Sequence, residues 1–216
     1  VYIIKLLDSE KTSAVLMELN EDIREKILQT LSAKEIAEEV EELDSDDAAD
    51  IIGELSEERQ EAVLSQIEDE EHVKEIEELL TYDEDSAGGL MAKELVKVNE
   101  NWNVLKCVRE MRAQAEEVTR VHSIYVVDND DKLKGRLSLK DLLIASTKTA
   151  ISEVYIPKVD FVNVHDDLDE VSIKMRKYDL EAIPVVDNNG VLLGRITIDD
   201  IVDVIKDEAD KDYQLA

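Results

Sequence analysis

Seven carboxylates lie in the sixteen residues "TIDDIVDVIKDEADKD", which run from 197 to 212. If a helix begins at Thr197, five aspartates fall within about one 100° sector of its surface. These are Asp199, Asp200, Asp203, Asp207 and Asp210. Apolar residues occupy the other side of the same helix, namely Ile201, Val202, Val204, Ile205 and Ala209. The pattern predicts a helix with one packed face and one carboxylate stripe, which is either a cation site or a solvated acidic face.

The position of the stripe along the helix bears on this choice. Like charges spaced i, i+3 and i+4 cost a few tenths of a kcal/mol per pair, roughly, which a surface helix tolerates. Asp207 and Asp210 lie toward the C-terminal end, where a negative charge opposes the helix dipole. A bound cation or a basic partner would compensate this cost.

The types of the available ligands indicate which metal would bind. The single cysteine, Cys107, excludes a cysteine-based zinc site, and His72, His122 and His165 are scattered along the chain. Oxygen ligands alone select magnesium, calcium or manganese. The stretch "DNDDKLKG" resembles a calcium loop over a few residues, but it is better explained as an acidic hairpin turn.

A second acidic surface is predicted in the first third of the chain. The stretch "LDSDDAADII" places Asp46 and Asp50 at i and i+4, on one face of a helix. Magnesium keeps several of its waters and needs only one or two direct carboxylates. It therefore suits an interface between two such acidic surfaces.

The overall charge limits the classes of partner. The chain of 216 residues has a formal net charge of −29, with 54 acidic and 25 basic residues. Such a charge repels nucleic acid and anionic membranes and attracts cations or basic partners. No apolar stretch approaches 18 residues and no signal peptide opens the sequence, so we expect a soluble chain of cytosolic character. We find no phosphate-binding glycine loop and no nucleophile–base pair, so we do not expect an enzyme.

The first third of the sequence repeats every twelve residues. Each repeat starts with Leu19, Leu31, Leu43, Leu55 or Ile67 and continues with a polar residue and an acidic turn. Ser32 with Glu35 is a capping-box pattern. We predict short helices that stack into a superhelical domain over 1–81, followed by a linker or hinge, "YDEDSAGG", at 82–89.

A longer repeat follows. The stretches 125–145 and 184–204 align without gaps at an offset of 59 residues, and both contain V-V-D-N and G-R. Each is read as a strand, a turn, a second strand and a helix opened by Asp. Helices are expected before them, at about 104–115 and 169–178, so each copy is a β-α-β-β-α unit. The predicted fold class is α+β, with the two copies packed as a pseudo-symmetric pair.

The signature "IPVVDNNGVLLGRITIDDI" resembles the CBS domain, and "IYVVDNDDKLKGRLSLKDL" is similar to it. Short acidic helices, then "YDEDSAGGLM", two CBS units and an acidic helix resemble the cytosolic part of MgtE-type magnesium transporters. The resemblance implies CBS domains at 90–150 and 151–209, and a connecting helix that begins at 210–216. It also implies a homodimer through the CBS domains, and a location on the cytoplasmic side of the cell membrane, next to a transmembrane domain of the same protein.

The family's metal positions transfer to individual residues of this sequence. The resemblance implies that magnesium is bound by Asp46, Asp50, Gly89 (through its carbonyl), Asp169, Asp179, Asp200, Asp203 and Glu208. Where the family member has Glu, this chain has Asp169. A further acidic position of the helical domain aligns with Ala14, so that ligand is absent or is replaced by a neighbour such as Glu18.

CBS pairs also bind adenine nucleotides in many proteins. The resemblance implies that Ser138, Lys140 and Asp141 would hold the ribose and phosphates of ATP, while plain helix capping by Ser138 is the alternative. An aromatic residue at 123 or 180 would stack on adenine, but this chain has Ser123 and Leu180 there.

The sequence thus predicts a magnesium-sensing regulatory region, in which ions bridge the acidic faces of the helical domain and the CBS dimer and favour a compact, closed state. An adenine-nucleotide-sensing CBS module of another transporter or enzyme is the alternative. A scaffold without any ligand response is a third reading.

Overall fold

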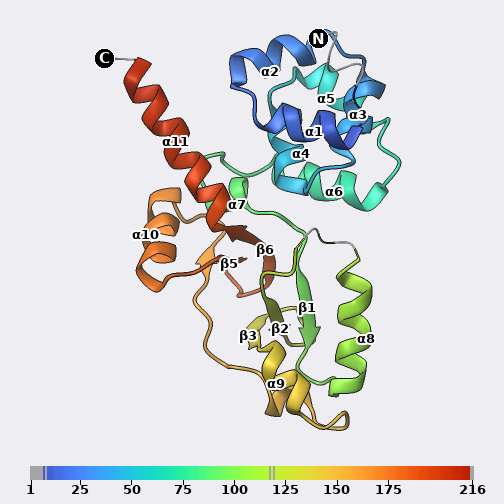
Figure 1. The fold of residues 1–216 in the computed structure, drawn as a ribbon, viewed down its shortest axis with the longest axis vertical. Helices are drawn as coiled ribbons and strands as arrows, with labels where there is room; N and C mark the ends of the chain where they lie inside the picture. Colours follow the sequence, from blue (N-terminus) through green and yellow to red (C-terminus); the bar gives the residue numbers. More distant parts are fainter. Residues whose placement is uncertain (1–6, 8, 117, 119, 215–216) are drawn as a thin grey trace. The chain divides into compact units, whose positions relative to one another are not determined.

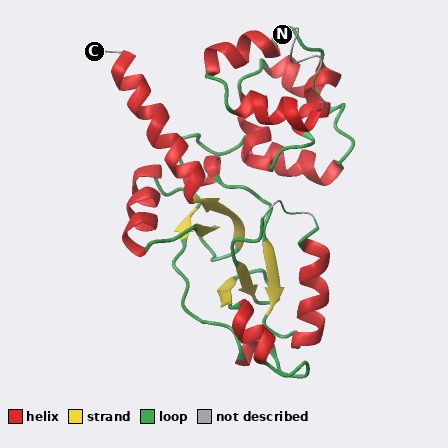
Figure 2. Cartoon of the chain, viewed as in Figure 1, coloured by secondary structure: helices red, strands yellow, loops and turns green. Residues whose placement is uncertain are grey.

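The computed structural model describes residues 7, 9–116, 118 and 120–214, and of residues 10, 21 and 207–214 it describes the backbone alone. The chain divides into two compact units, Val1–Tyr82 and Asp83–Ala216. The described part of the first unit is built from helices, and the second combines helices with two small sheets (Figures 1 and 2).

The helices of the first unit follow the twelve-residue repeat. They are α1 (Ser9–Met17), α2 (Glu21–Leu28), α3 (Ala33–Val40), α4 (Ser45–Gly53), α5 (Glu57–Leu64) and α6 (Glu70–Leu79). The polar residue after each leading apolar residue is an N-cap in most repeats, and the Ser32–Glu35 capping box is confirmed in both directions. Short helices of this kind are stable because they share a core, which includes Leu16, Leu28, Ile36, Ile51 and Ile76.

Arg59 on α5 fastens non-neighbouring parts of this core. Its Nη2 donates to the carbonyl oxygens of Leu28 at 3.0 Å and Leu31 at 2.9 Å. Leu28 is the last residue of α2, and Leu31 lies in the turn between α2 and α3. The guanidinium therefore holds the end of α2 and the following turn against α5.

Replacing Arg59 with Gln is expected to lower the free energy of unfolding of the first unit by roughly 2 kcal/mol, because hydrogen bonds to a charged donor are lost at a part-buried site. The matched control is Lys34→Gln, which removes an exposed i,i+4 ion pair with Glu38 and should cost less than about 0.5 kcal/mol. Urea denaturation followed by circular dichroism measures both. Equal losses in the two variants would contradict the role given to Arg59.

The second unit contains two β-α-β-β-α copies, as predicted. The first has β1 (Val96–Asn99), α8 (Val104–Gln114), β2 (Ile124–Val127), β3 (Leu133–Leu137) and α9 (Leu139–Ile144). The second has β4 (Val162–Asn163), α10 (Leu168–Tyr178), β5 (Ala182–Val186), β6 (Leu192–Thr197) and α11 (Ile198–Gln214). In each sheet the first two strands are parallel and the last two antiparallel. The predicted α+β fold class is confirmed.

The two copies are joined through equivalent turns of their hairpins. The amide of Leu133 donates to the carbonyl of Gly190, and the amide of Leu192 donates to the carbonyl of Asp131, both at 2.9 Å. Asp131 and Gly190 are equivalent in the repeat, and both have positive φ, at 56° and 82°. The buried Tyr125 packs with Val127 and Leu192 between the two sheets.

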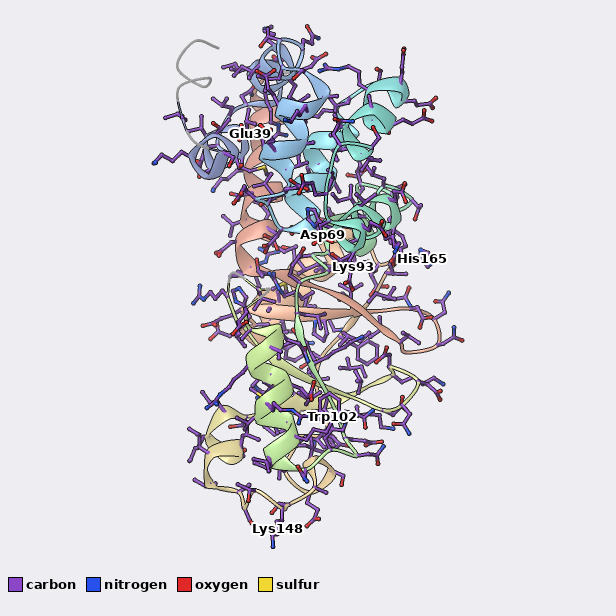
Figure 3. The ribbon with its side chains drawn as sticks, turned by 90° about the vertical axis from the view of Figure 1, so that its right-hand side faces the viewer. Glu39, Asp69, Lys93, Trp102, Lys148 and His165 are labelled. Carbon is purple, nitrogen blue, oxygen red and sulfur yellow. The ribbon has the colours of Figure 1, made fainter. Side chains whose placement is uncertain are left out.

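Cys107 and Trp102 both belong to the core of the first β-α-β-β-α copy. Cys107 is fully buried in this core, where burial raises the pKa of its thiol to about 11. It therefore acts as a small apolar residue. Trp102 packs against the same core and has the Lys106 ammonium above its ring (Figure 3).

The stretch predicted as a linker is more ordered at its end than the sequence suggests. We call residues 83–95 the connector segment. Its short helix α7 (Ala87–Leu90) begins at a buried alanine, and the amides of Ala87 and Gly88 donate to the carbonyls of Asp166 and Val164, which flank α10 and β4. From Asp85 onward, the predicted linker is therefore hydrogen-bonded within the second unit.

Candidate functional site

The two acidic residues predicted in the first unit share a face of α4. Asp46 and Asp50 are four residues apart within Ser45–Gly53. The Oδ1 atom of Asp46 accepts a hydrogen bond from the Asp47 amide at 2.9 Å, and the side chain of Asp50 is exposed. The opposite face of the helix, with Ala48, Ile51 and Ile52, is buried. Packing thus holds the helix so that both carboxylates are at the surface of the unit.

The carboxylate stripe of α11 divides into two environments. Asp203 is exposed and pairs with Lys206, with 2.6 Å between Oδ1 and Nζ. Asp200 is half-buried, and its Oδ2 accepts hydrogen bonds from the amide and the hydroxyl of Thr197, both at 2.8 Å. Asp200 therefore caps the helix as well as facing the acidic side. The side chains of Asp207, Glu208 and Asp210 lie outside the described residues.

Burial changes the acidity of Asp200. Desolvation raises its pKa above the ordinary value, while the hydrogen bonds from Thr197 and the charge of Arg195 act in the opposite direction. The ionised form of Asp200 is thus held at some cost, which a bound cation would reduce. The apolar side of α11 also differs from expectation, because Ile201 is buried but Val202 and Ile205 are exposed.

Asp169 and Asp179 lie at opposite ends of α10. Asp169 is in the first turn, and Asp179 is the C-cap. The helix rises 1.5 Å per residue, so their Cα atoms are about 15 Å apart. Both side chains are exposed, and Asp179 has left-handed backbone geometry with φ of 51°. The two carboxylates cannot bind the same ion, so this set of residues implies more than one site.

Gly89 lies in the connector segment, beside the start of α10. A Cβ atom there would stand 2.4 Å from the carbonyl oxygen of Asp83, so a side chain cannot be accommodated. The connector and the loop before α10 are joined by a bridge between Ser86 and Asp167 and by the bond from the Leu168 amide to the Asp85 carbonyl. The structure therefore brings the segments of Gly89 and Asp169 together.

The residues predicted for ATP lie at the start of α9. Ser138 is the N-cap, and its Oγ accepts a hydrogen bond from the Asp141 amide at 3.4 Å. Lys140 is exposed, and Asp141, Ser123 and Leu180 are partly exposed. Helix capping, the alternative considered for Ser138, is its observed structural role.

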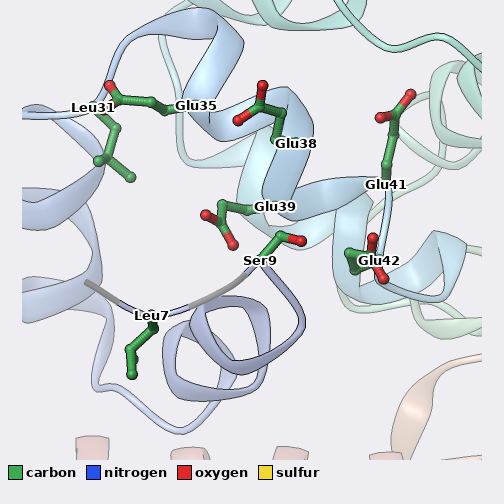
Figure 4. A pocket seen from close by; sticks show the side chains of 8 residues that line it. All are labelled: Leu7, Ser9, Leu31, Glu35, Glu38, Glu39, Glu41 and Glu42. Carbon is green, nitrogen blue, oxygen red and sulfur yellow. The ribbon is translucent and has the colours of Figure 1, made fainter. Parts of the chain in front are cut away.

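Sequence reasoning did not find a pocket of about 420 Å³ in the first unit (Figure 4). It is lined by Leu7, Ser9, Leu31, Glu35, Glu38, Glu39, Glu41 and Glu42. Several of these carboxylates have partners within the unit: Glu35 is in the capping box, and Glu38 pairs with Lys34. The predicted metal ligands do not line this pocket.

Sequence reasoning also missed a buried charged residue of the second β-α-β-β-α copy. Arg195 on β6 is only 6% exposed, and its charge acts on Asp200, Tyr125 and His122. Desolvation raises the pKa of Tyr125, and desolvation, together with Arg195 and Arg120, lowers that of His122. The only signal in the sequence was the G-R dipeptide that both copies share. That dipeptide does not indicate which of the two arginines is buried.

Comparison with known proteins identifies the two units. The MgtE intracellular N domain family matches residues 1–85, and the CBS domain family matches residues 87–148 and 151–207. The magnesium transporter MgtE of Thermus thermophilus is 44% identical over 131 residues, which is 61% of this chain and 29% of the transporter. The chain therefore spans well under two thirds of that relative. Among the described residues, no helix has the length and apolarity needed to cross a membrane.

Solved structures extend the match over both units. A crystal structure of the cytosolic domain of the Mg²⁺ channel MgtE in complex with ATP is 37% identical, with a TM-score of 0.85, and the match covers 94% of this chain and 83% of that one. A second, of the soluble part of a magnesium transporter, is 30% identical, with a TM-score of 0.74, and the match covers 96% and 91%. These three relatives are described as magnesium transporters or a Mg²⁺ channel. The chain belongs to the MgtE family and corresponds to its cytosolic domain, an N domain followed by a pair of CBS domains.

Proposed function

We propose that this chain is the magnesium-sensing regulatory region of a magnesium transporter or channel. Magnesium ions bridge carboxylates of the N domain, Asp46 and Asp50, to carboxylates of the CBS pair and favour a compact, closed state. The observation that supports this best is the placement of Asp50, Asp169, Asp179 and Asp203 as exposed carboxylates on well-packed helices, in a chain of charge −29. Asp200, Glu208 and the carbonyl of Gly89 complete the proposed ligand set.

The energetics require several ions. One site at three times its Kd stabilises the bound state by about 0.8 kcal/mol. An almost complete two-state switch needs about 5.5 kcal/mol of differential binding. The separation of about 15 Å between Asp169 and Asp179 agrees with a set of distinct sites. Isothermal titration calorimetry should therefore find more than one magnesium ion per chain, and heats no larger than those of matched sodium chloride would refute the proposal.

The proposed movement centres on residues 82–85. The rest of the predicted hinge, from Ser86 to Gly89, is hydrogen-bonded within the second unit. Without magnesium, repulsion between acidic surfaces favours separation of the N domain from the CBS pair. In the full-length protein we propose that the compact state draws α11 and the helix that follows it toward a closed arrangement of the transmembrane domain, on the cytoplasmic side of the membrane.

We also propose a homodimer through the CBS helices. Large apolar side chains are exposed on α8 and α9 of the first copy, and on α10 and α11 of the second. They are Leu105, Leu139, Leu143, Ile144, Ile173, Tyr178, Val202 and Ile205. Leu143 and Ile144 are 76% and 75% exposed. Three of these residues lie on the short helix α9, and exposed apolar side chains gathered on one helix favour a protein interface.

Leu143→Asp is expected to convert the dimer into a monomer, because a charge placed at the centre of an apolar interface has no partner there. Light scattering coupled to size-exclusion chromatography should show the mass fall by half. The control is Lys148→Asp, at another exposed position, on the loop after α9. A monomeric wild-type chain, or a variant that remains dimeric, would contradict this interface.

ATP binding is the second candidate, favoured by the ATP complex of the 37% identical relative. Ser138, Lys140 and Asp141 would contact its ribose and phosphates. Because Ser123 and Leu180 offer no aromatic ring for stacking, we expect weak affinity and little preference for adenine. Calorimetry with ATP, AMP and GTP, each with and without magnesium, separates a nucleotide sensor from a magnesium sensor.

A further inference from the structure

The connector segment pairs with β6 of the second CBS copy before it enters the first. The amide of Ala92 donates to the Arg195 carbonyl at 2.8 Å, and the Arg195 amide donates to the Ala92 carbonyl at 2.9 Å. Met91 and Ala92 are fully buried. Figure 1 shows the chain passing α7 and β6 on its way to β1. The residues that follow the N domain are thus part of the second CBS copy.

The side chain of Arg195 adds a further bond to this pairing. Its Nε donates to the carbonyl oxygen of Glu94 at 2.7 Å. Along β6, the side chains of Arg195 and Thr197 point to the same face, because strand side chains alternate. Thr197 in turn donates to the carboxylate of Asp200 in the first turn of α11. The Arg195 side chain, which bonds to the connector, and the Thr197 side chain, which bonds to Asp200, therefore lie on the same face of β6.

The electrostatics agree with this geometry. The positive charge of Arg195 lowers the pKa of Asp200, against the larger effect of burial, which raises it. A guanidinium that is 6% exposed requires such partners, because an uncompensated buried charge is strongly destabilising.

The repeat offers an internal comparison. Arg136 is the equivalent residue of the first copy, and its backbone exchanges the same pair of hydrogen bonds with Ile156, at 3.1 and 2.9 Å. Gly135 and Gly194 precede the two arginines, and in both copies a Cβ atom would meet the paired segment. The side chain of Arg136, however, is exposed. The two sites have the same backbone pairing, and they differ in what the side chain contacts.

We propose that Arg195 is a positioning residue that links residues 92–94 of the connector to the first turn of α11. Magnesium bound near α11 then rigidifies the connector, and by thermodynamic reciprocity an ordered connector strengthens magnesium binding. This inference rests on the proposed magnesium-sensing function. It adds that magnesium binding is coupled to the connector segment through β6 of the second CBS copy, instead of through β1 of the first.

Hydrogen exchange with mass spectrometry on the whole chain tests this, with wild type, Arg195→Lys and the matched Arg136→Lys. Lysine keeps the charge but has no Nε–H in the place where arginine donates to Glu94. Without magnesium, exchange at residues 92–96 should be roughly tenfold faster in Arg195→Lys, as expected for loss of a charge-assisted hydrogen bond, and unchanged in Arg136→Lys. Thermal unfolding verifies that both variants fold.

Magnesium addition provides the second comparison. In wild type and Arg136→Lys, magnesium should slow hydrogen exchange at residues 92–96. Arg195→Lys should still bind magnesium by calorimetry, but with little gain there. An equal gain in Arg195→Lys and wild type would overturn the link while leaving the proposed function intact. Absence of calorimetric magnesium binding in wild type would instead overturn the proposed function, and the link to magnesium with it.

Discussion

Replacing Asp46 and Asp50 together with asparagine is expected to remove most of the magnesium-dependent protection of residues 82–85 against proteases. The carboxylates lie on one face of α4, whose other face is buried, so the change removes two charges without disturbing the core. In the proposed mechanism the N domain then lacks its magnesium ligands, so magnesium no longer bridges it to the CBS pair. The magnesium concentration at half-protection should rise at least tenfold, roughly the effect of losing 1.4 kcal/mol of coupled binding.

A charge-matched control distinguishes ligand loss from reduced repulsion. Glu57→Gln with Glu58→Gln removes two exposed carboxylates from the first turn of α5 in the same domain. Both double variants remove two negative charges from the chain. A general electrostatic effect would therefore shift both magnesium titrations by the same amount. If the α5 variant loses as much protection as the α4 variant, Asp46 and Asp50 are not specific ligands.

Asp200→Asn is expected to have opposite effects with and without magnesium. Burial raises the pKa of Asp200, so its ionised form contributes unfavourably to stability at neutral pH. An asparagine oxygen can still accept from Thr197, so the helix cap survives in part. Without magnesium, the thermal midpoint should therefore stay the same or rise. Magnesium should raise the thermal midpoint less in Asp200→Asn than in wild type, because one anionic ligand is gone.

The pH dependence supplies an independent measurement. For a carboxyl group whose folded pKa is raised, the favourable contribution is complete below the unfolded pKa and is lost as pH rises through the folded pKa. The free energy of unfolding of the wild-type chain should therefore fall as pH rises through the folded pKa of Asp200. This decrease should be absent in Asp200→Asn. Asp141→Asn, at the equivalent position of the first copy, is the control. A large loss of magnesium-free stability in Asp200→Asn alone would show that the carboxylate is purely structural.

Much of the fold follows from local patterns in the sequence. The polar residue after each Leu of the twelve-residue repeat sets the helix starts, because N-caps act within one turn. The second repeat indicated a duplicated β-α-β-β-α unit, since strand, turn and helix signals recur at one spacing. The helix expected at 104–115 is observed at Val104–Gln114, and the one expected at 169–178 at Leu168–Tyr178.

Features that depend on contacts between distant parts of the chain could not be predicted from local sequence patterns. The stretch "YDEDSAGG" was predicted as a linker because of its glycine pair and acidic run, yet the amides of Ala87 and Gly88 bond to the carbonyls of Asp166 and Val164, far along the chain. The two G-R dipeptides are locally identical, but Arg195 is buried and Arg136 exposed. The stripe on α11 was derived from helical angles alone, which cannot show that Asp200 bonds back to Thr197.

The candidate metal residues depended on the family resemblance more than on any pattern. Helical spacing placed Asp46 with Asp50, and the structure agrees with that spacing. No spacing rule would select Asp169 and Asp179, which lie at the two ends of α10, or a glycine carbonyl in the connector. In the proposed mechanism their grouping would depend on how the domains assemble around ions, which local sequence patterns do not encode.

The central claim is that magnesium, by specific binding, compacts the chain. Small-angle X-ray scattering of the wild-type chain during a magnesium chloride titration measures this directly, against sodium chloride at equal ionic strength. We predict that the radius of gyration falls in a saturable manner with magnesium and stays nearly constant with sodium. No change with magnesium, or the same decrease with sodium, would contradict the proposed sensing mechanism.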